Sequence, residues 1–155
     1  SSAASDVYKR QVLQDILGTW SVVSVAEYLA DLGKKVTIVA PSGVPGWSIS
    51  MYSSFALLSR LREKSVRIIR GYEVLSHQQG IVELTDLSLG GVGLEIVADN
   101  VVSPEVGNSN RKLSLSLEAW SAQGPNRKLV SVGDCQAPRT ALEAIFEGHE
   151  AARLI

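Results

Sequence analysis

The sequence predicts an α/β fold in which a parallel sheet is accompanied by an antiparallel β-meander. Three observations support this prediction: an amphipathic helix between two apolar strands near the start, a run of short strands separated by glycine-containing turns in the middle, and a well-capped helix at the end. The composition, with 45% hydrophobic and 20% charged residues, is that of an ordinary globular chain of 155 residues.

Residues 12–39 are typical of a compact strand–helix–strand unit. Residues 12–17 and 36–39 are the two apolar strands, and Gly33 stands where a glycine commonly ends a helix. Between the strands, apolar side chains recur at helical spacing: Val22, Val25, Ala26, Leu29 and Leu32. Strands joined in this way are expected to be parallel neighbours in one sheet.

The middle of the chain changes from helical to alternating character. Residues 51–64 predict a second helix, followed by a third parallel strand over residues 66–69. The apolar face of that helix is expected to contain Met51, Phe55, Leu58 and Leu61. Short strands separated by Gly-rich turns then predict an antiparallel meander over residues 72–76, 81–84 and 94–97, with one more short strand at 100–103.

The last third of the chain predicts helix, strand and helix. Residues 110–120 are expected to be helical, and residues 129–132 to form a strand. Thr140 and Glu143 have the spacing of a capping box, so a final helix is expected over residues 140–154. Its apolar side contains Leu142, Ile145 and Phe146.

Residues 1–11 read as the translation of a transposase sequencing-library adapter and contain no apolar segment typical of a signal peptide. We expect them to be an artefact rather than native sequence, so that the fold begins at Val12. Because such a junction lies inside a reading frame, we expect the chain to be the C-terminal part of a longer protein.

Charge and cysteine content argue against several classes of function. With 15 Lys and Arg against 16 Asp and Glu, the net charge is −1, so we expect neither nucleic acid nor an anionic membrane as a partner. The single cysteine, Cys135, and the isolated His77 and His149 lack the spacing of a metal site. One group of cations is typical of a solvated face: Arg60, Arg62, Lys64, Arg67 and Arg70.

The segment from the predicted strand at 129–132 into the last helix suits a nucleotide. Gly133 allows close backbone approach, and the Asp134 carboxylate can accept hydrogen bonds from sugar or ribityl hydroxyls. The N–H groups at the start of the last helix favour an anion, and Arg139 adds a cation there. The alternative is that Gly133 and Asp134 form only a turn at a strand end.

The first turn between strand and helix is a candidate second nucleotide site, made by Gly18, Thr19, Trp20 and Ser21. A dinucleotide fingerprint needs three glycines at G-x-G-x-x-G spacing, whereas Val22 and Ser24 stand where further glycines would be expected. No acidic residue ends the second strand to bind a ribose hydroxyl. NAD(P) binding is therefore doubtful, and a scaffold without nicotinamide is the preferred interpretation.

Three motifs resemble one family: VGDCQAPR at 132–139, AIFEGHEAAR at 144–153 and AEYLADLGKKVTIV at 26–39. They are similar to the C-terminal part of the multidomain relatives of old yellow enzyme, which include trimethylamine dehydrogenase and bacterial 2,4-dienoyl-CoA reductase. The resemblance implies an absent N-terminal barrel with FMN, a [4Fe–4S] cluster and the substrate site. It also implies two Rossmann-like nucleotide-binding domains of the FAD/NAD(P)-binding type.

By this resemblance, residues 12–104 are an NAD(P)-binding-like domain with a degenerate glycine loop, and residues 105–155 return to the FAD- or ADP-binding domain. The residues expected beside FAD or ADP are Gly133, Asp134, Pro138, Arg139, Thr140 and Ala141. Half of that nucleotide site would precede Val12, so the chain alone should bind poorly.

The resemblance implies the nucleotide-binding part of a cytoplasmic flavin-dependent oxidoreductase, of the amine dehydrogenase or N-demethylase type. Its partners would be its own barrel, the other half of its FAD domain and an electron-transfer flavoprotein. The chain alone would be inactive, because the catalytic centre lies in the barrel. The alternatives are part of an NAD(P)H-dependent enoyl reductase of the dienoyl-CoA type, or a non-catalytic binding or assembly module.

Overall fold

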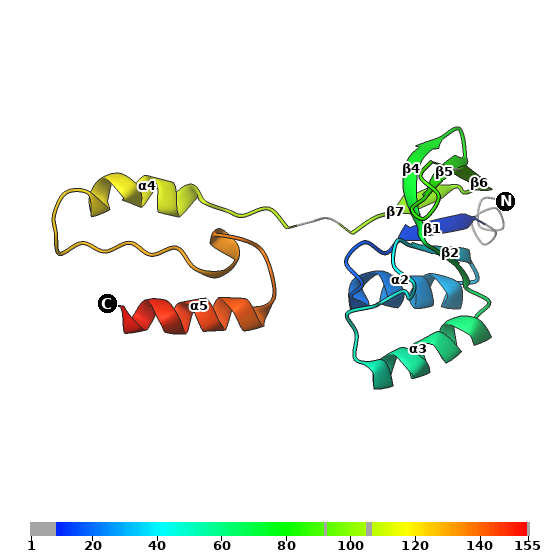
Figure 1. Cartoon of the computed structure of the whole chain (residues 1–155), viewed down its shortest axis with the longest axis horizontal. Helices are drawn as coiled ribbons and strands as arrows, with labels where there is room; N and C mark the ends of the chain where they lie inside the picture. Colours follow the sequence, from blue (N-terminus) through cyan, green and yellow to red (C-terminus); the bar gives the residue numbers. More distant parts are fainter. Residues whose placement is uncertain (1–8, 92, 105–106, 155) are drawn as a thin grey trace. The chain divides into compact units, whose positions relative to one another are not determined.

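The computed structural model describes residues 9–91, 93–104 and 107–154. The chain divides into two compact units, Ser1–Pro104 and Glu105–Ile155 (Figure 1). The first unit contains both sheets and two helices, whereas the second is built from helices and irregular backbone.

The first unit is organised around a parallel sheet with the strand order β3-β2-β1-β7. Its strands are β1 (Arg10–Gln14), β2 (Lys35–Ala40), β3 (Arg67–Arg70) and β7 (Asn100–Val102). The helices α2 (Trp20–Asp31) and α3 (Met51–Glu63) connect the first three strands. Gly33 ends α2 with a positive φ of 74°, as the sequence predicts.

Alternation along the strands divides the core between the two faces of the parallel sheet. Leu13 and Ile38, which are register partners, contact the helices through Val23, Ala26 and other buried side chains. Val12 and Val39 belong to the second core cluster, on the opposite face. Each face is therefore closed by a different layer.

The layer on that second face is a three-stranded antiparallel sheet with the order β4-β5-β6. Its strands are β4 (Tyr72–Gln78), β5 (Ile81–Asp86) and β6 (Gly93–Val97). Val82 and Leu84 of β5 are buried, whereas Glu83 between them is exposed, as expected for a strand with one solvated face. The predicted α/β fold with a parallel sheet and a meander is thus confirmed.

The second unit consists of α4 (Lys112–Ser121), the short 3₁₀ helix η1 (Gly133–Cys135) and α5 (Ala141–Arg153). Neither α4 nor α5 contains a buried side chain. Phe146 on α5 is 59% exposed, and its neighbour Ile145 is 72% exposed. The apolar side predicted for the last helix is therefore open to solvent within this unit.

Three expectations from the sequence are wrong. The strand β1 begins at Arg10, so the fold includes Arg10 and Gln11, which we had excluded with residues 1–11; residues 1–8 lie outside the described part. Residues 129–132 form no strand, because no strand of the second unit's described residues is available to pair with them.

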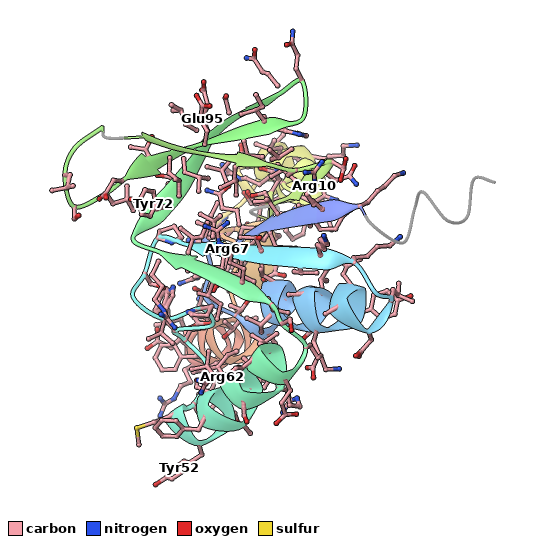
Figure 2. All side chains as sticks on the ribbon, turned by 90° about the vertical axis from the view of Figure 1, so that its right-hand side faces the viewer. Arg10, Tyr52, Arg62, Arg67, Tyr72 and Glu95 are labelled. Carbon is pink, nitrogen blue, oxygen red and sulfur yellow. The ribbon has the colours of Figure 1, made fainter. Side chains whose placement is uncertain are left out.

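The third difference concerns α3, whose buried side chains are Leu57 and Leu61. Met51 and Phe55, predicted on the core face, are 62% and 68% exposed. The neighbouring Tyr52 also projects from the helix (Figure 2). The first half of α3 therefore presents apolar side chains to solvent. No described helix is long and apolar enough to cross a bilayer.

We expect Leu57→Ala to lower the free energy of unfolding by about 2–5 kcal/mol, because it leaves a cavity under α3 in a fully buried position. Met51→Ala on the same helix is the control, and it should change that free energy by less than about 0.5 kcal/mol, since Met51 is exposed. Urea denaturation followed by circular dichroism measures both. Equal losses from the two variants would contradict this packing of α3.

Candidate functional site

Gly133 starts the segment that the sequence singles out for nucleotide binding, and it requires its glycine. Its φ is +65°, a conformation that L side chains rarely adopt. A Cβ at this position would lie 3.1 Å from the Cβ of Ala144, so the glycine allows η1 to pack closely on α5. Gly133 is buried, whereas Asp134 beside it is exposed.

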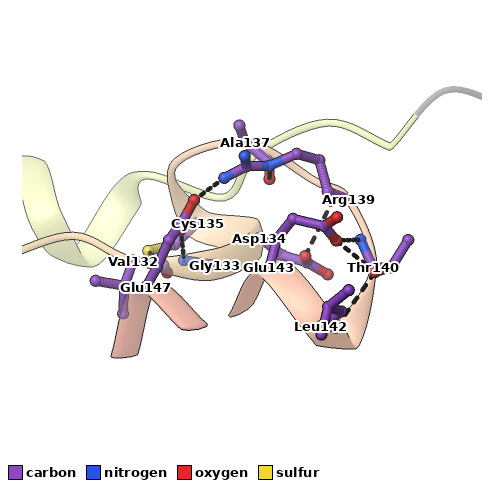
Figure 3. Close-up of polar contacts among 10 residues, drawn as sticks. All are labelled: Val132, Gly133, Asp134, Cys135, Ala137, Arg139, Thr140, Leu142, Glu143 and Glu147. Atoms are coloured by element: carbon purple, nitrogen blue, oxygen red, sulfur yellow. Dashed lines mark hydrogen bonds and ion pairs between the residues drawn. The ribbon is translucent and has the colours of Figure 1, made fainter. Parts of the chain in front are cut away.

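Glu147 on α5 holds this segment in place (Figure 3). Its Oε2 accepts a hydrogen bond from the backbone N–H of Gly133 at 2.7 Å, and its Oε1 pairs with the guanidinium of Arg139. Arg139 is therefore engaged by a carboxylate of its own chain. Because a carboxylate can accept several donors at once, Glu147 fixes the glycine turn and the arginine relative to α5.

Asp134 has hydrogen-bonding capacity left for a ligand. Its Oδ1 accepts only a long hydrogen bond from the backbone N–H of Arg139, at 3.4 Å. Among the described residues no donor reaches its Oδ2. An exposed carboxylate with a lone oxygen can accept a hydrogen bond from a sugar or ribityl hydroxyl, which is the role that the sequence predicts.

The start of α5 carries the predicted capping box, which is confirmed. The Leu142 N–H donates to the Thr140 hydroxyl at 3.2 Å, and the Thr140 N–H donates to the Glu143 carboxylate at 3.0 Å. The hydrogen bond from the Thr140 hydroxyl lowers the pKa of Glu143, and backbone N–H groups and Arg139 lower it further. The Glu143 carboxylate thus already lies at the N-terminus of α5, where the sequence predicts that an anion is favoured.

The remaining predicted residues contribute backbone and shape rather than charge. Pro138 lies in the loop before α5, where it approaches Gly107, and Ala141 is the first residue of α5. Cys135 is half-buried and its Sγ contacts the carbonyl oxygen of Val132 at 3.0 Å, as expected of a packed small side chain.

A cavity of about 430 Å³ lies in the same unit, but it is not centred on Asp134. Its walls are mainly apolar side chains of α4 and of residues 129–130, and Cys135 is the one residue of η1 that lines it. The exposed Asp134 carboxylate and the cavity are therefore separate features of the described part of this unit.

The second candidate site, the turn after β1, is closed by the chain itself. Asp15 is fully buried, and its two carboxylate oxygens accept backbone N–H groups from Gly18 at 3.1 Å and Gly46 at 2.6 Å. A phosphate bound at such a turn would need those same N–H donors. The Asp15 carboxylate therefore occupies the position at which the backbone would bind an anion.

The loop before α3 completes this closure. Ser48 donates its hydroxyl to the carbonyl oxygen of Gly18 at 2.6 Å, and the Trp47 indole lies directly where a Cβ of Gly18 would be. The hydroxyls of Thr19 and Ser21 hydrogen-bond to each other at 2.8 Å. Gly18 is thus required for packing against Trp47 rather than for approach of a ligand.

Sequence reasoning missed Asp15, Gly46 and Glu147, which organise both sites. The hydrogen bond from Gly46 to Asp15 spans 31 residues, so no local pattern announces it. Trp20, a member of the candidate second nucleotide site, is 47% exposed at the start of α2. No group of three or more His, Cys, Asp or Glu among the described residues is placed to hold a metal ion.

No protein-family model and no curated protein matches this sequence. Two solved structures are similar to it at 26% identity. The 6-hydroxypseudooxynicotine amine oxidase of Pseudomonas geniculata N1 matches 92% of this chain with a TM-score of 0.79, and this corresponds to 21% of the oxidase. The histamine dehydrogenase of Rhizobium sp. 4-9 matches 95% with a TM-score of 0.81, which corresponds to 23% of the dehydrogenase.

Two more distant structures share the fold alone. A 2-naphthoyl-CoA reductase matches 95% of this chain and 21% of its own, at 21% identity with a TM-score of 0.67. A flavoprotein disulfide reductase of Escherichia coli matches 96% of this chain and 36% of its own, at 16% identity with a TM-score of 0.59. The chain is therefore related in structure to oxidoreductases, and it spans about a fifth of the length of the amine oxidase and the histamine dehydrogenase.

Asp15→Ala should destabilise the first unit strongly, because it leaves the N–H groups of Gly18 and Gly46 buried without an acceptor. Each unsatisfied donor costs about 1–3 kcal/mol. Asp15→Asn keeps one acceptor oxygen and should lose less. Urea denaturation gives the ranking, and an Asp15→Ala protein as stable as the parent chain would contradict the closure of this turn.

The pKa of Glu143 should lie below its ordinary value of 4.5, and Thr140→Val should raise it towards that value by removing the largest cause of the shift. Thr140→Ser keeps the hydroxyl and should leave the pKa low. A lowered pKa means that the carboxylate stabilises α5 above pH 4.5 and that this contribution is lost as the pH falls through the folded-state value. Carboxyl-carbon NMR titration measures each pKa, and equal values in all three proteins would contradict the capping box.

Proposed function

We propose that this chain supplies the nucleotide-binding region of a flavin-dependent oxidoreductase that acts on amines. The observation that supports this proposal is the similarity of the chain, over 92–95% of its length, to an amine oxidase and a histamine dehydrogenase, with TM-scores of 0.79 and 0.81. The proposal includes a catalytic part outside this chain, since the chain corresponds to only 21–23% of those enzymes. On this proposal the chain alone does not turn over an amine.

The proposed ligand of the second unit is the FAD or ADP moiety, held at Asp134. Its exposed carboxylate accepts a hydrogen bond from a hydroxyl of the sugar or ribityl chain. The preceding Gly133, with its positive φ, lets η1 pack closely on α5. Arg139, fixed by Glu147, adds a cation one short loop away. In this proposal FAD would supply the redox-active flavin, ADP would serve only as a bound group, and this chain positions the nucleotide.

The closed turn after β1 argues against a nicotinamide cofactor there. The N–H of Gly18 is already donated to Asp15, and Trp47 covers the same glycine. An NAD(P)H-dependent enoyl reductase would need this turn open, so the amine dehydrogenase type is the better supported proposal. FMN and the iron–sulfur cluster belong to the proposed catalytic part, and an electron-transfer flavoprotein as acceptor remains a prediction.

Titration of the full chain with ADP and with FAD, followed by ¹⁵N NMR, tests the proposed site. We expect millimolar ligand to shift the amide signals of Gly133, Asp134 and Arg139. Asp134→Ala should weaken binding about tenfold, the loss expected for one hydrogen bond to a charged group. Signals of Gly18 and Thr19 should stay unchanged.

Glu150→Ala is the matched control, because it removes an exposed carboxylate from α5 without touching the proposed site. It should leave the titration unaltered. Shifts confined to the turn after β1, or equal weakening by both variants, would overturn the proposed nucleotide site.

A further inference from the structure

The first unit has a cavity of about 650 Å³ where its two sheets separate. One wall is formed by the amino ends of β1, β2 and β3, and the other by β6. This is the opposite end of the parallel strands from Asp15 and the closed turn. The size is within the range of about 300–1,000 Å³ that is usual for small-molecule sites.

The pairing register places three cations of this wall on one face of the parallel sheet. Arg10 of β1 is the register partner of Lys35 in β2, and Thr37, two residues further, is the partner of Arg67 in β3. Register partners in neighbouring strands share a face, as do alternate residues of one strand. Arg10, Lys35 and Arg67 therefore stand on the side that faces β6.

Some of the cations at this cavity are paired with carboxylates and others are not. Arg10 pairs with Asp99, with 3.6 Å between Nε and Oδ2, and Lys64 at the same cavity pairs with Asp31 of α2. Among the described residues, neither Lys35 nor Arg67 has an ion pair. Both are exposed, and both line the cavity.

The floor of the cavity is apolar. Val12 and Ile96, which line it, are buried members of the core cluster between the two sheets. Glu95 of β6 also borders the cavity, but it alternates with the inward-facing Ile96, so its side chain lies on the exposed outer face of the meander. Figure 2 shows Glu95 apart from Arg10 and Arg67. The lining therefore combines an apolar floor with a rim that carries more positive than negative charge.

We propose that this cavity binds an organic phosphate, with the phosphate at Lys35 and Arg67 and the apolar part against the half-buried side chain of Leu94. Of the three cations on this face, Lys35 and Arg67 have no ion pair among the described residues, so a bound dianion would compensate their charge. It would accept charge-assisted hydrogen bonds from the guanidinium of Arg67. The inference concerns the first unit and is independent of the nucleotide proposed at Asp134.

The test uses the full chain and three probes: phenyl phosphate, inorganic phosphate and phenol. We expect phenyl phosphate to bind saturably at millimolar concentrations and to shift the amide signals of Lys35, Thr37, Arg67 and Ile96. Inorganic phosphate should bind more weakly at the same residues, since it lacks the apolar group, and phenol should not bind.

Three variants sharpen the test. Arg67→Gln should weaken phenyl phosphate about tenfold, as expected for the loss of one charge-assisted hydrogen bond. Lys35→Gln should weaken it by a similar factor, because Lys35 is the second cation at which the phosphate is placed. Arg62→Gln, on α3 outside this cavity, is the control with the same change of charge and should leave the affinity unchanged.

The proposal is overturned if phenyl phosphate does not bind saturably, or if the shifted signals lie elsewhere in the chain. It is also overturned if Arg67→Gln and Arg62→Gln weaken binding equally, because that result indicates attraction by net charge alone. Unchanged binding by Lys35→Gln would contradict the placement of the phosphate at this rim.

Discussion

The buried carboxylate of Asp15 is the constraint on which the carboxyl end of the parallel sheet depends. It stands just after β1 and accepts N–H groups from two separate turns, at Gly18 and at Gly46. A buried charge of this kind is tolerated when hydrogen bonds satisfy it, and here both oxygens are used. The loop before α3 is thereby held against the first turn, and Trp47 covers Gly18. The strand–turn–helix unit at the start of the fold is in this way closed by the chain's own side chains.

The second unit uses a carboxylate differently. Glu147 fixes Gly133 and Arg139 from within α5, whereas Asp134 keeps an oxygen directed to solvent. One acidic side chain therefore builds the turn, and the other is the one that we propose to bind the nucleotide. The exposed apolar side chains of α5 indicate that this unit carries a surface that its own residues do not cover.

Features with a local cause were predictable from the sequence. The Thr140–Glu143 capping box and the glycine end of α2 each depend on a few adjacent residues, and both are present. The alternation that separates Val12 from Leu13 likewise follows from the strand geometry. The fold class was predictable because these local patterns agree with one another.

Features with a distant cause were not predictable. Asp15 reaches Gly46 across 31 residues, and Glu147 reaches Gly133 across 14, so neither contact leaves a pattern at short spacing. The buried face of α3 was misjudged because Met51 and Phe55 have the same helical spacing as core residues, and only the tertiary contacts select Leu57 and Leu61. The strand expected at residues 129–132 was predicted from its apolar residues alone. A strand also needs a partner strand to pair with, and the local sequence does not show whether one is present.

Photolabelling with 8-azido-ADP tests most directly the central claim, that the turn after β1 is closed and that the nucleotide is held by the segment before α5. The full chain is irradiated with the reagent, digested with trypsin, and the labelled peptide is identified by mass spectrometry, with excess ADP as the competitor. The account predicts ADP-sensitive label on the peptide that contains Gly133 and Asp134. Label on the peptide that contains Gly18 and Trp20, removed by the same excess of ADP, would contradict it.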